Sequence, residues 1–187
     1  MDRILVRPSG PLSGDVKING AKNSALKLMA ACTLAQGTYL LKEVPDITDV
    51  QSMAELLRSM GLTVRNLETN QIEIVNPGDI TPEAPYEQVE KMRASIVVLG
   101  PLVSTYGKAR VALPGGDDFG PRPIDMHLKG LEALGVRFSS EHGYIEAEAE
   151  RLTGSRVVLD FPSVGATENI MMAAVRAQGE TIIENAA

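Results

Sequence analysis

The fold of this chain is decided by Leu56-Leu57-Arg58-Ser59-Met60-Gly61-Leu62-Thr63-Val64, which recurs as Leu131-Glu132-Ala133-Leu134-Gly135-Val136-Arg137-Phe138. In each copy, apolar side chains follow helical spacing, a glycine ends the helix, and a strand begins directly after it. The chain therefore contains one α/β unit more than once.

Working outward from the first copy gives the elements of a first unit. Its first helix is apolar on nearly every side, which is typical of a buried helix. Its second helix carries a single apolar stripe, which indicates a helix that packs on the core with one face. In chain order the unit contains the apolar helix that Gly20–Ser24 opens and that runs to about Ala35, the strand 38–44, a helix that Thr48 caps in a capping box with Gln51, and the strands 63–67 and 71–75.

The same order returns twice. The second unit contains an apolar helix over 92–105, kinked or broken at Gly100–Pro101, the strand 108–113, a helix capped by Asp125, and the hairpin 136–139 and 144–147. The third contains a strand from 156, an apolar helix over 167–177 and a strand over 180–184, where a second helix and a hairpin should follow. Two short strands, 4–7 and 15–19, come before the first unit. We predict an α/β (α+β) fold of repeated βαβαββ units with buried apolar helices and a truncated third unit.

Composition limits the class of protein. The chain has 187 residues, is 44% hydrophobic, and carries 18 basic against 24 acidic residues, for a net charge of −6. Nucleic-acid binding would require a clustered basic excess, so we expect no nucleic-acid partner. The single cysteine, Cys32, lies among apolar neighbours and is expected to be a small buried hydrophobe in a reducing compartment. Met1–Val6 has no apolar run long enough for a signal peptide or membrane span, so we expect a cytoplasmic protein that does not bind membranes.

The loop Leu113–Asp125 combines glycines, prolines, two acids and one arginine. Glycines let backbone N–H groups approach an anion, the carboxylate of Asp117 can transfer a proton, and the guanidinium of Arg122 can hold a phosphate with two hydrogen bonds. The same composition also fits an ordinary acidic surface turn, and composition alone does not decide between the two interpretations.

Basic and polar residues recur at the turns that precede the apolar helices. Lys22-Asn23, Arg93 and Ser163-Val164-Gly165 stand at such helix starts, where free N–H groups and the helix dipole favour anions. Their recurrence in a repeat indicates a shared site for a multiply anionic ligand. In the alternative, the cations are solvated and the polar residues are ordinary helix caps, namely Asn23, Ser163 and Thr167.

Metal chemistry is not indicated. The chain has two histidines, His127 and His142, and one cysteine, too few for a typical zinc site. His127 follows the loop inside a helix and is expected to be a structural or exposed residue rather than a base.

The chain resembles the UDP-N-acetylglucosamine 1-carboxyvinyltransferases, a family of enolpyruvyl transferases. The resemblance extends over all 187 positions and is carried by five segments: Gly20–Ser24, Met92–Ser95, Leu113–Asp125, Ser163–Thr167 and Ile183–Ala187. It implies two similar domains, each an inside-out α/β barrel of three repeated units with the helices inside, of which this chain matches the N-terminal half. Residues 1–19 would be strands of the missing second domain, and 20–187 would be an enolpyruvyl transferase domain incomplete at its C-terminus.

The resemblance also implies an activity: transfer of the enolpyruvyl group from phosphoenolpyruvate to the 3-hydroxyl of UDP-N-acetylglucosamine, the first committed step of peptidoglycan synthesis. It implies no metal or organic cofactor, and it makes Asp117 the proton donor. The phosphoenolpyruvate ligands would be Lys22, Asn23, Arg93 and Arg122. The UDP-N-acetylglucosamine ligands would be Arg93, Arg122, Pro123, Ile124, Asp125, Met126, Ser163, Val164 and Gly165.

Two other functions stay open. One is the related shikimate-pathway enolpyruvyl transferase, against which the Pro114-Gly115-Gly116-Asp117 loop and the 122–125 segment argue. The other is a non-catalytic half-enzyme that binds nucleotide sugar or associates with a partner. Without its second domain, the chain is expected to be inactive alone and prone to self-association.

The chain departs from the family pattern at two positions. Most members carry cysteine at the position of Asp117, although an active aspartate variant exists within the family. Some relatives carry a phosphate-binding lysine at the position of Phe161, so this chain is expected to lack that contact.

The aspartate predicts resistance to fosfomycin, which inactivates members of this family by alkylating the loop cysteine. A carboxylate is a far poorer nucleophile toward the epoxide than a thiolate. The wild-type protein should therefore stay unlabelled when treated with the drug, and Asp117→Cys should gain one adduct by intact mass spectrometry. Stoichiometric labelling of the wild-type protein at Asp117 would contradict the prediction.

Overall fold

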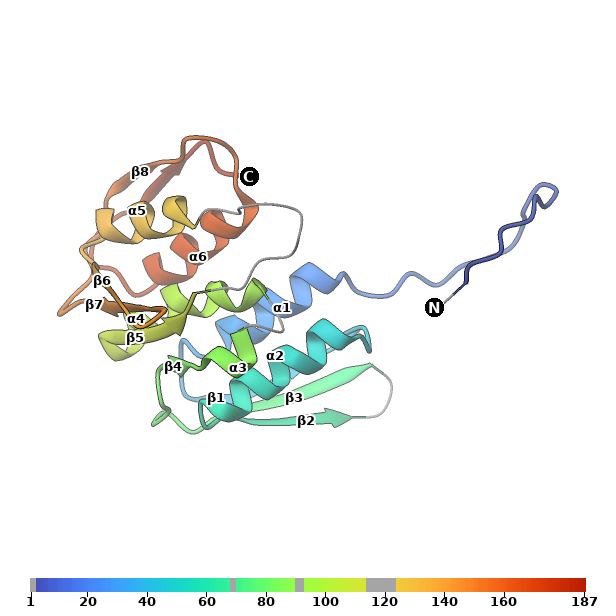
Figure 1. The fold of residues 1–187 in the computed structure, drawn as a ribbon, viewed down its shortest axis with the longest axis horizontal. Helices are drawn as coiled ribbons and strands as arrows, with labels where there is room; N and C mark the ends of the chain where they lie inside the picture. The colour runs from blue at the N-terminus through green and yellow to red at the C-terminus, as the bar shows by residue number, and fades with distance from the viewer. Residues whose placement is uncertain (1–2, 68–69, 90–92, 114–123) are drawn as a thin grey trace.

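The computed structural model describes residues 3–67, 70–89, 93–113 and 124–187. Its elements follow the predicted order of three units (Figure 1). The first unit comprises α1 (Lys22–Ala31), β1 (Gly37–Leu41), α2 (Thr48–Ser59), β2 (Thr63–Leu67) and β3 (Gln71–Asn76). The second comprises β4 (Glu83–Ala84), α3 (Tyr86–Val89), the 3₁₀ helix η1 (Arg93–Val98), α4 (Leu99–Tyr106), β5 (Lys108–Ala112), α5 (Asp125–Ala133), β6 (Arg137–Glu141) and β7 (Tyr144–Glu148). The third comprises β8 (Arg156–Val158), α6 (Val164–Ala174) and β9 (Ile182–Glu184).

Each unit has a small sheet of its own. In the first, β3 lies between β1 and β2 and pairs antiparallel with both, with Gly37 opposite Asn76. The second has the order β4-β5-β7-β6, with β4 parallel to β5 and an antiparallel register of Lys108 opposite Glu148 between β5 and β7. In the third, β8 and β9 form a parallel pair. The predicted hairpins of the first two units, β2-β3 and β6-β7, are thus confirmed.

The apolar helices lie inside, with the sheets toward the outside (Figure 1). Leu99 and Leu102 of α4 are fully buried, and α4 packs on α6, as does α5. Small residues allow this close packing: a Cβ at Gly130 of α5 would lie 2.1 Å from Cδ1 of Ile170 on α6. The α/β fold with buried helices is therefore confirmed, and the closed inside-out barrel stays a prediction.

The repeated stretch has the same backbone structure in both copies. Gly61 and Gly135 have positive φ angles of +102° and +99°. After α2, the N–H groups of Gly61 and Leu62 donate to the carbonyls of Arg58 and Leu57, at 3.0 and 3.1 Å. After α5, the N–H groups of the glycine at 135 and the valine at 136 donate in the same way to the carbonyls three and five residues before them. Each helix therefore ends in a Schellman motif, in which glycine accepts the left-handed conformation most easily.

Several boundary predictions were wrong. The capping box does not form, because Ile47 is the N-cap of α2 and Gln51 donates from Nε2 to Asp46 Oδ1 at 3.0 Å instead. Asp125 is likewise the first residue of α5 rather than its cap. The apolar helix of the second unit is divided between Val98 and Leu99, slightly before the expected break. Pro101 explains the division, because it has no N–H to continue the helix and its ring crowds the carbonyl four residues earlier. Strand β4 and helix α3 were not predicted, since each is too short to show a periodic pattern.

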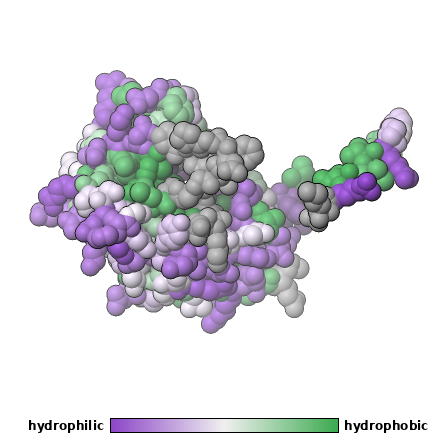
Figure 2. Space-filling view, viewed as in Figure 1, coloured by the Kyte–Doolittle hydropathy of each residue, from purple (hydrophilic) through white to green (hydrophobic). Residues whose placement is uncertain are grey.

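The predicted strands 4–7 and 15–19 are absent from the described chain. Residues 3–21 form neither helix nor strand, and Figure 1 shows that they extend away from the body as an arm. Their apolar side chains, including Val16 and Ile18, are exposed and appear as a hydrophobic stripe in Figure 2. A strand requires a neighbouring strand to complete its hydrogen bonds, and within the described residues no strand pairs with the arm, which contacts the body through Lys17 and Glu43. The assignment of 1–19 to a second domain stays a prediction.

Replacing either glycine of the two Schellman motifs should destabilise the fold to a similar extent. Gly61→Ala and Gly135→Ala force a Cβ into a left-handed conformation, and each should lower the free energy of unfolding by about 1–2 kcal/mol. Gly10→Ala is the control, because a Cβ there meets nothing within 4 Å. Urea unfolding followed by circular dichroism measures all three. Equal stability of Gly61→Ala and Gly10→Ala would contradict the role of the left-handed glycine.

Candidate anion-binding site

The first predicted ligands lie where α1 begins. Ala21 is the N-cap of α1, and its methyl side chain cannot accept a hydrogen bond from the first turn. The idea that Asn23 caps this helix is therefore wrong, because Asn23 lies inside α1. Lys22 Nζ lies 2.7 Å from Asp49 Oδ2 in the first turn of α2, with side chains 51% and 39% exposed. Such an exposed ion pair contributes little to stability, so an anionic ligand could replace the carboxylate of Asp49.

Asp49, the ion-pair partner of the candidate ligand Lys22, was not predicted from the sequence. It is 27 positions away from Lys22 along the chain. In the sequence, Asp49 is recognisable only as part of a helix start. It pairs with Lys22 because α1 and α2 pack together with both N-terminal ends on one side. No local signal in the sequence could have predicted it.

The first turns of α5 and α6 carry the next predicted ligands. Met126 is buried, whereas Asp125 is half-exposed and lies 3.9 Å from Lys129. Ser163 is the N-cap of α6, and its side chain accepts a hydrogen bond from the N–H of Ala166 at 3.4 Å, as the capping alternative predicted. Val164 projects into solvent. One N–H group of this turn is thus paired with the side chain of its own cap, and the turn is open to solvent at Val164.

These helix starts belong to one side of the molecule. α1, α5 and α6 all begin on the side from which the N-terminal arm leaves (Figure 1). One turn further in, Lys27 of α1 pairs with Glu168 of α6 at 3.1 Å, which places the first halves of these two helices next to each other. The structure therefore brings Lys22, Asn23, Asp125, Met126 and Ser163–Gly165 to one side of the body.

The remaining predicted ligands are less fully described. Asp117, Arg122 and Pro123 lie outside the described residues. The backbone of Arg93 begins η1, whose residues Ile96, Val97 and Val98 are buried. Ile124 is the N-cap of α5 and is half-buried, and Phe161 is exposed.

His127 is buried beside this site. Its ring is 8% exposed, and Nδ1 lies 3.0 Å from Nδ2 of Asn169 on α6. A Cβ at position 165 would lie 3.3 and 3.4 Å from ring atoms Cε1 and Nε2, so Gly165 leaves room for the imidazole. Burial lowers the pKa of His127 from 6.5 to about 4, against a smaller opposing effect of the Asp125 carboxylate. The ring is neutral at neutral pH, which agrees with the predicted structural role.

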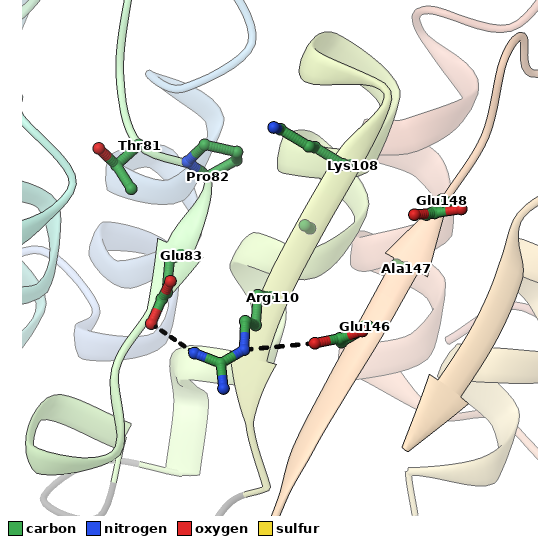
Figure 3. A pocket seen from close by; sticks show the side chains of 9 residues that line it. Thr81, Pro82, Glu83, Lys108, Arg110, Glu146, Ala147 and Glu148 are labelled. Carbon is green, nitrogen blue, oxygen red and sulfur yellow. Dashed lines mark hydrogen bonds and ion pairs between the residues drawn. The ribbon is translucent and has the colours of Figure 1, made fainter. Parts of the chain in front are cut away.

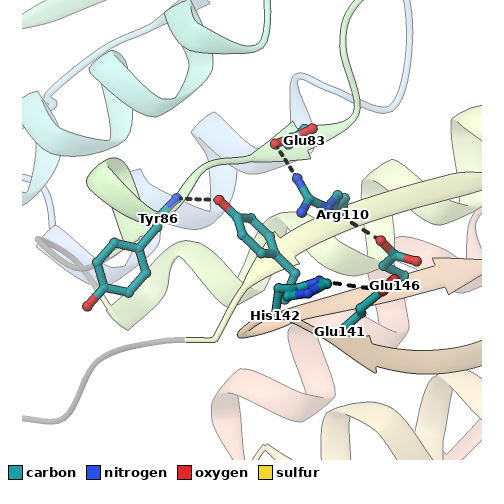
Figure 4. A network of polar contacts seen from close by, with 7 residues as sticks. Glu83, Tyr86, Arg110, Glu141, His142 and Glu146 are labelled. Atoms are coloured by element: carbon teal, nitrogen blue, oxygen red, sulfur yellow. Dashed lines mark hydrogen bonds and ion pairs between the residues drawn. The ribbon is translucent and has the colours of Figure 1, made fainter.

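A groove elsewhere on the surface does not belong to this site. A groove of about 260 Å³ on the outer face of the β4-β5-β7-β6 sheet is lined by charged side chains (Figure 3). Arg110 pairs with Glu83 at 2.9 Å and Glu146 at 3.4 Å, and its guanidinium stacks 3.7 Å from the centre of the Tyr144 ring (Figure 4). Its cation is already neutralised, so the groove offers no free charge for an anion at Arg110.

Two further tests concern the described residues only. Within the described ranges, none of the helices is both long and apolar enough to cross a lipid bilayer. The same residues contain no group of three or more His, Cys, Asp or Glu side chains arranged to hold a metal ion. The Cys32 thiol is buried, and burial raises its pKa to about 12, so it remains a thiol.

The structure is thus an α/β repeat in which α1, α5 and α6 begin on one side of the body, beside the polar and basic side chains of the candidate site. Residues 6–187 match the family model for EPSP synthase (3-phosphoshikimate 1-carboxyvinyltransferase), and the chain belongs to this family. Over its 187 residues it is 54% identical to UDP-N-acetylglucosamine 1-carboxyvinyltransferase 2 of Carboxydothermus hydrogenoformans. It is 53% identical to UDP-N-acetylglucosamine 1-carboxyvinyltransferase of Corynebacterium jeikeium over 186 residues. Both alignments include 100% of this chain but only 44% of the relative, so the chain spans less than half the length of these proteins.

Solved structures show the same fold. The enolpyruvyl transferase NikO from Streptomyces tendae matches with a TM-score of 0.78 and 23% identity, over 92% of this chain and 40% of that one. EPSP synthase from Acinetobacter baumannii matches with a TM-score of 0.71 and 17% identity, over 91% and 40% of the two chains. The resemblance to enolpyruvyl transferases is thus confirmed at the level of family and fold.

The buried neutral His127 predicts a specific dependence of stability on pH. Below pH 6.5 the unfolded chain protonates this ring, whereas the folded chain does so only near pH 4. Stability contributed by the neutral ring is therefore complete above pH 6.5 and is lost as the pH falls toward 4. At about 1.36 kcal/mol for each unit by which the pKa is lowered, the loss is at most about 3–4 kcal/mol.

Urea unfolding at pH 7, 6 and 5 tests this prediction, with the pH values chosen as approximate steps across the window. The stability difference between wild type and His127→Gln should shrink as the pH falls. His142→Gln is the control, because His142 is exposed and its variant should follow the wild-type curve. A constant difference for His127→Gln at all three pH values would contradict a buried neutral ring.

Proposed function

We propose that this chain supplies phosphoenolpyruvate- and UDP-N-acetylglucosamine-binding residues of an enzyme that transfers the enolpyruvyl group to the sugar 3-hydroxyl and releases phosphate. The observation that carries the proposal is the 54% identity over all 187 residues to a protein of that name. The residues of the candidate site are of the types that such substrates require. The reaction would begin peptidoglycan synthesis, and a single buried cysteine suits the reducing cytoplasm in which we place it.

Charge neutralisation would be the main task of the basic residues. Phosphoenolpyruvate carries a phosphate and a carboxylate, and UDP-N-acetylglucosamine carries a diphosphate. Lys22 at the start of α1 would meet one of these anions, with Arg93 and Arg122 supplying further positive charge and Asn23 an amide. The first turns of α5 and α6 would hold the nucleotide sugar through 122–126 and 163–165, where free N–H groups favour phosphate oxygens.

The chemistry is an addition followed by an elimination. The 3-hydroxyl gives up its proton to a base and its oxygen bonds to the central carbon of phosphoenolpyruvate, while a proton from an acid adds to the terminal carbon. That carbon then loses a proton, the bond to the phosphate oxygen breaks, and phosphate leaves. Asp117 would donate the first proton, which requires that its pKa be raised in a site from which water is excluded. No step requires a metal or an organic cofactor.

Two alternatives are less well supported. The relatives at 49–54% identity are UDP-N-acetylglucosamine enzymes, whereas the solved EPSP synthase is only 17% identical. This difference favours the nucleotide sugar over shikimate 3-phosphate. A non-catalytic half-enzyme remains the second candidate, because the chain spans 44% of the length of its relatives and the enzyme would need a second domain to close over the substrates.

The purified 187-residue chain separates these functions. We expect calorimetry to show weak heat of binding with UDP-N-acetylglucosamine and none with shikimate 3-phosphate. We expect no phosphate release from phosphoenolpyruvate, because the half-built site cannot exclude water. Phosphate release by the chain alone would show that the second domain is dispensable, and preferential binding of shikimate 3-phosphate would support the shikimate-pathway activity.

Arg122 provides a test at the level of one residue. Its neighbours Pro121 and Pro123 restrict the backbone, which favours a positioned guanidinium. Arg122→Ala should weaken nucleotide-sugar binding by about 1.5–3 kcal/mol, the usual contribution of a hydrogen bond to a charged group. Arg65→Ala is the control, because Arg65 pairs with Glu73 on the sheet of the first unit. Equal affinity of the two variants would return Arg122 to the role of a solvated loop residue.

A further inference from the structure

Asn169 of α6 is completely buried, and its side-chain amide contacts three other elements. Oδ1 accepts a hydrogen bond from the N–H of Gly100 in α4 at 2.7 Å. Nδ2 donates to the carbonyl of Ile96 in η1 at 3.1 Å and lies 3.0 Å from Nδ1 of His127 in α5. All the polar atoms of this amide thus have a partner, and each partner comes from a different element.

The two backbone contacts fix which way the amide faces. Gly100 can only donate through its N–H, and Ile96 can only accept through its carbonyl. The two groups are four residues apart, the spacing that a continuous α-helix would pair. The amide contacts both at the junction of η1 and α4. A Cβ at position 100 would lie 2.4 Å from both the backbone oxygen and Oδ1 of Asn169, so only glycine allows this approach.

The orientation of the amide in turn fixes the protonation of His127. Nδ2 faces Nδ1 of the ring with a hydrogen, so Nδ1 must act as an acceptor. Because burial keeps the ring neutral, its one proton is then on Nε2, the atom next to Gly165 at the start of α6. Asn169 therefore determines that the ring presents a protonated Nε2 at that turn.

Two of the contacted elements, η1 and α5, carry proposed ligands, and so does α6, to which Asn169 itself belongs. Ile96 lies three residues after Arg93, His127 directly follows Met126, and Asn169 is itself one turn after Gly165. We propose that Asn169 is a positioning residue, whose amide holds the ligand-bearing starts of η1, α5 and α6 in one arrangement and keeps the proton of His127 on Nε2. The role as positioner of ligands rests on the proposed function.

A second buried asparagine offers a matched control. Asn76 at the end of β3 is 1% exposed. Its Oδ1 accepts from the N–H of Gly78 at 2.8 Å, and its Nδ2 donates to the carbonyl of Cys32 at 3.0 Å. Both amides thus bridge a glycine N–H and a backbone carbonyl, but only Asn169 adds a contact to a histidine.

The test compares Asn169→Asp with Asn76→Asp by NMR on the 187-residue chain. Each variant keeps the acceptor for the glycine N–H and replaces the donor with an oxygen. In Asn169→Asp that oxygen faces Nδ1 of His127, which should respond by taking up a proton on Nδ1. Two-bond ¹⁵N–¹H correlations report the tautomer, and the two histidines of the chain give two signals, with His142 as the internal reference.

Wild type and Asn76→Asp should show His127 protonated on Nε2, and Asn169→Asp should show it protonated on Nδ1. The backbone amide signals of Arg93, Met126 and Gly165 should move in Asn169→Asp and stay in place in Asn76→Asp. An Nδ1–H tautomer in the wild-type protein would by itself overturn the proposal. The proposal can therefore be tested even if a variant fails to fold. Equal shifts at the three amides in both variants would also overturn it.

Ligand binding is measured separately, by titrating each protein with UDP-N-acetylglucosamine. Asn169→Asp should weaken binding at least about tenfold relative to Asn76→Asp, since a small displacement of ligand groups has large effects. If the wild-type chain shows no binding at all, the proposed function fails for this chain, while the tautomer and the amide shifts still decide the positioning role. Equal affinity of the two variants would leave Asn169 an ordinary buried residue and overturn the proposal.

Discussion

The close contact of α4 with α6 is the constraint on which the rest of the structure depends. A fully buried helix has to satisfy its polar groups without water, and here the side chain of one helix satisfies the backbone of the other. The contact forms because Gly100 has no Cβ, which lets the side chain of Asn169 reach the N–H of Gly100 between the two helices. The helices can thus lie inside while the small sheets lie outside, the reverse of the arrangement in which helices cover a central parallel sheet.

The buried helices also explain why polar residues gather at their starts. A helix start leaves N–H groups without intrahelical partners, and in a buried layer these groups can be hydrated only at the edge. α1, α5 and α6 begin on one side of the body, so the unpaired donors and the positive ends of three helix dipoles point the same way (Figure 1). The repeat therefore places three helix N-termini on one side of the body, and the proposed anion-binding face depends on this arrangement together with side chains such as Lys22.

The charge of Lys22 contributes little to folding. The Lys22–Asp49 pair is exposed enough to be weak, so exchanging the carboxylate for a ligand anion costs little stability. By contrast, every polar atom of the buried amide of Asn169, behind the face, has a partner. A well-packed interior behind an exposed surface is the arrangement that the proposed site would require to hold two anionic substrates in register.

The sequence by itself determined the repeat, the order of the helices and strands and the family, because these depend on local periodicity and on glycines such as Gly61 and Gly135 that end each unit in the same way. It also predicted ligands at the helix starts, and these assignments stay predictions. Only the tertiary structure decided the pairing of Lys22 with Asp49, the burial of His127 and the three contacts of Asn169. These depend on residues 27 to 73 positions apart, and no local pattern records which side chains meet when helices pack. The strands predicted for 4–7 and 15–19 fail for the same reason, since a strand exists only where a partner lies beside it.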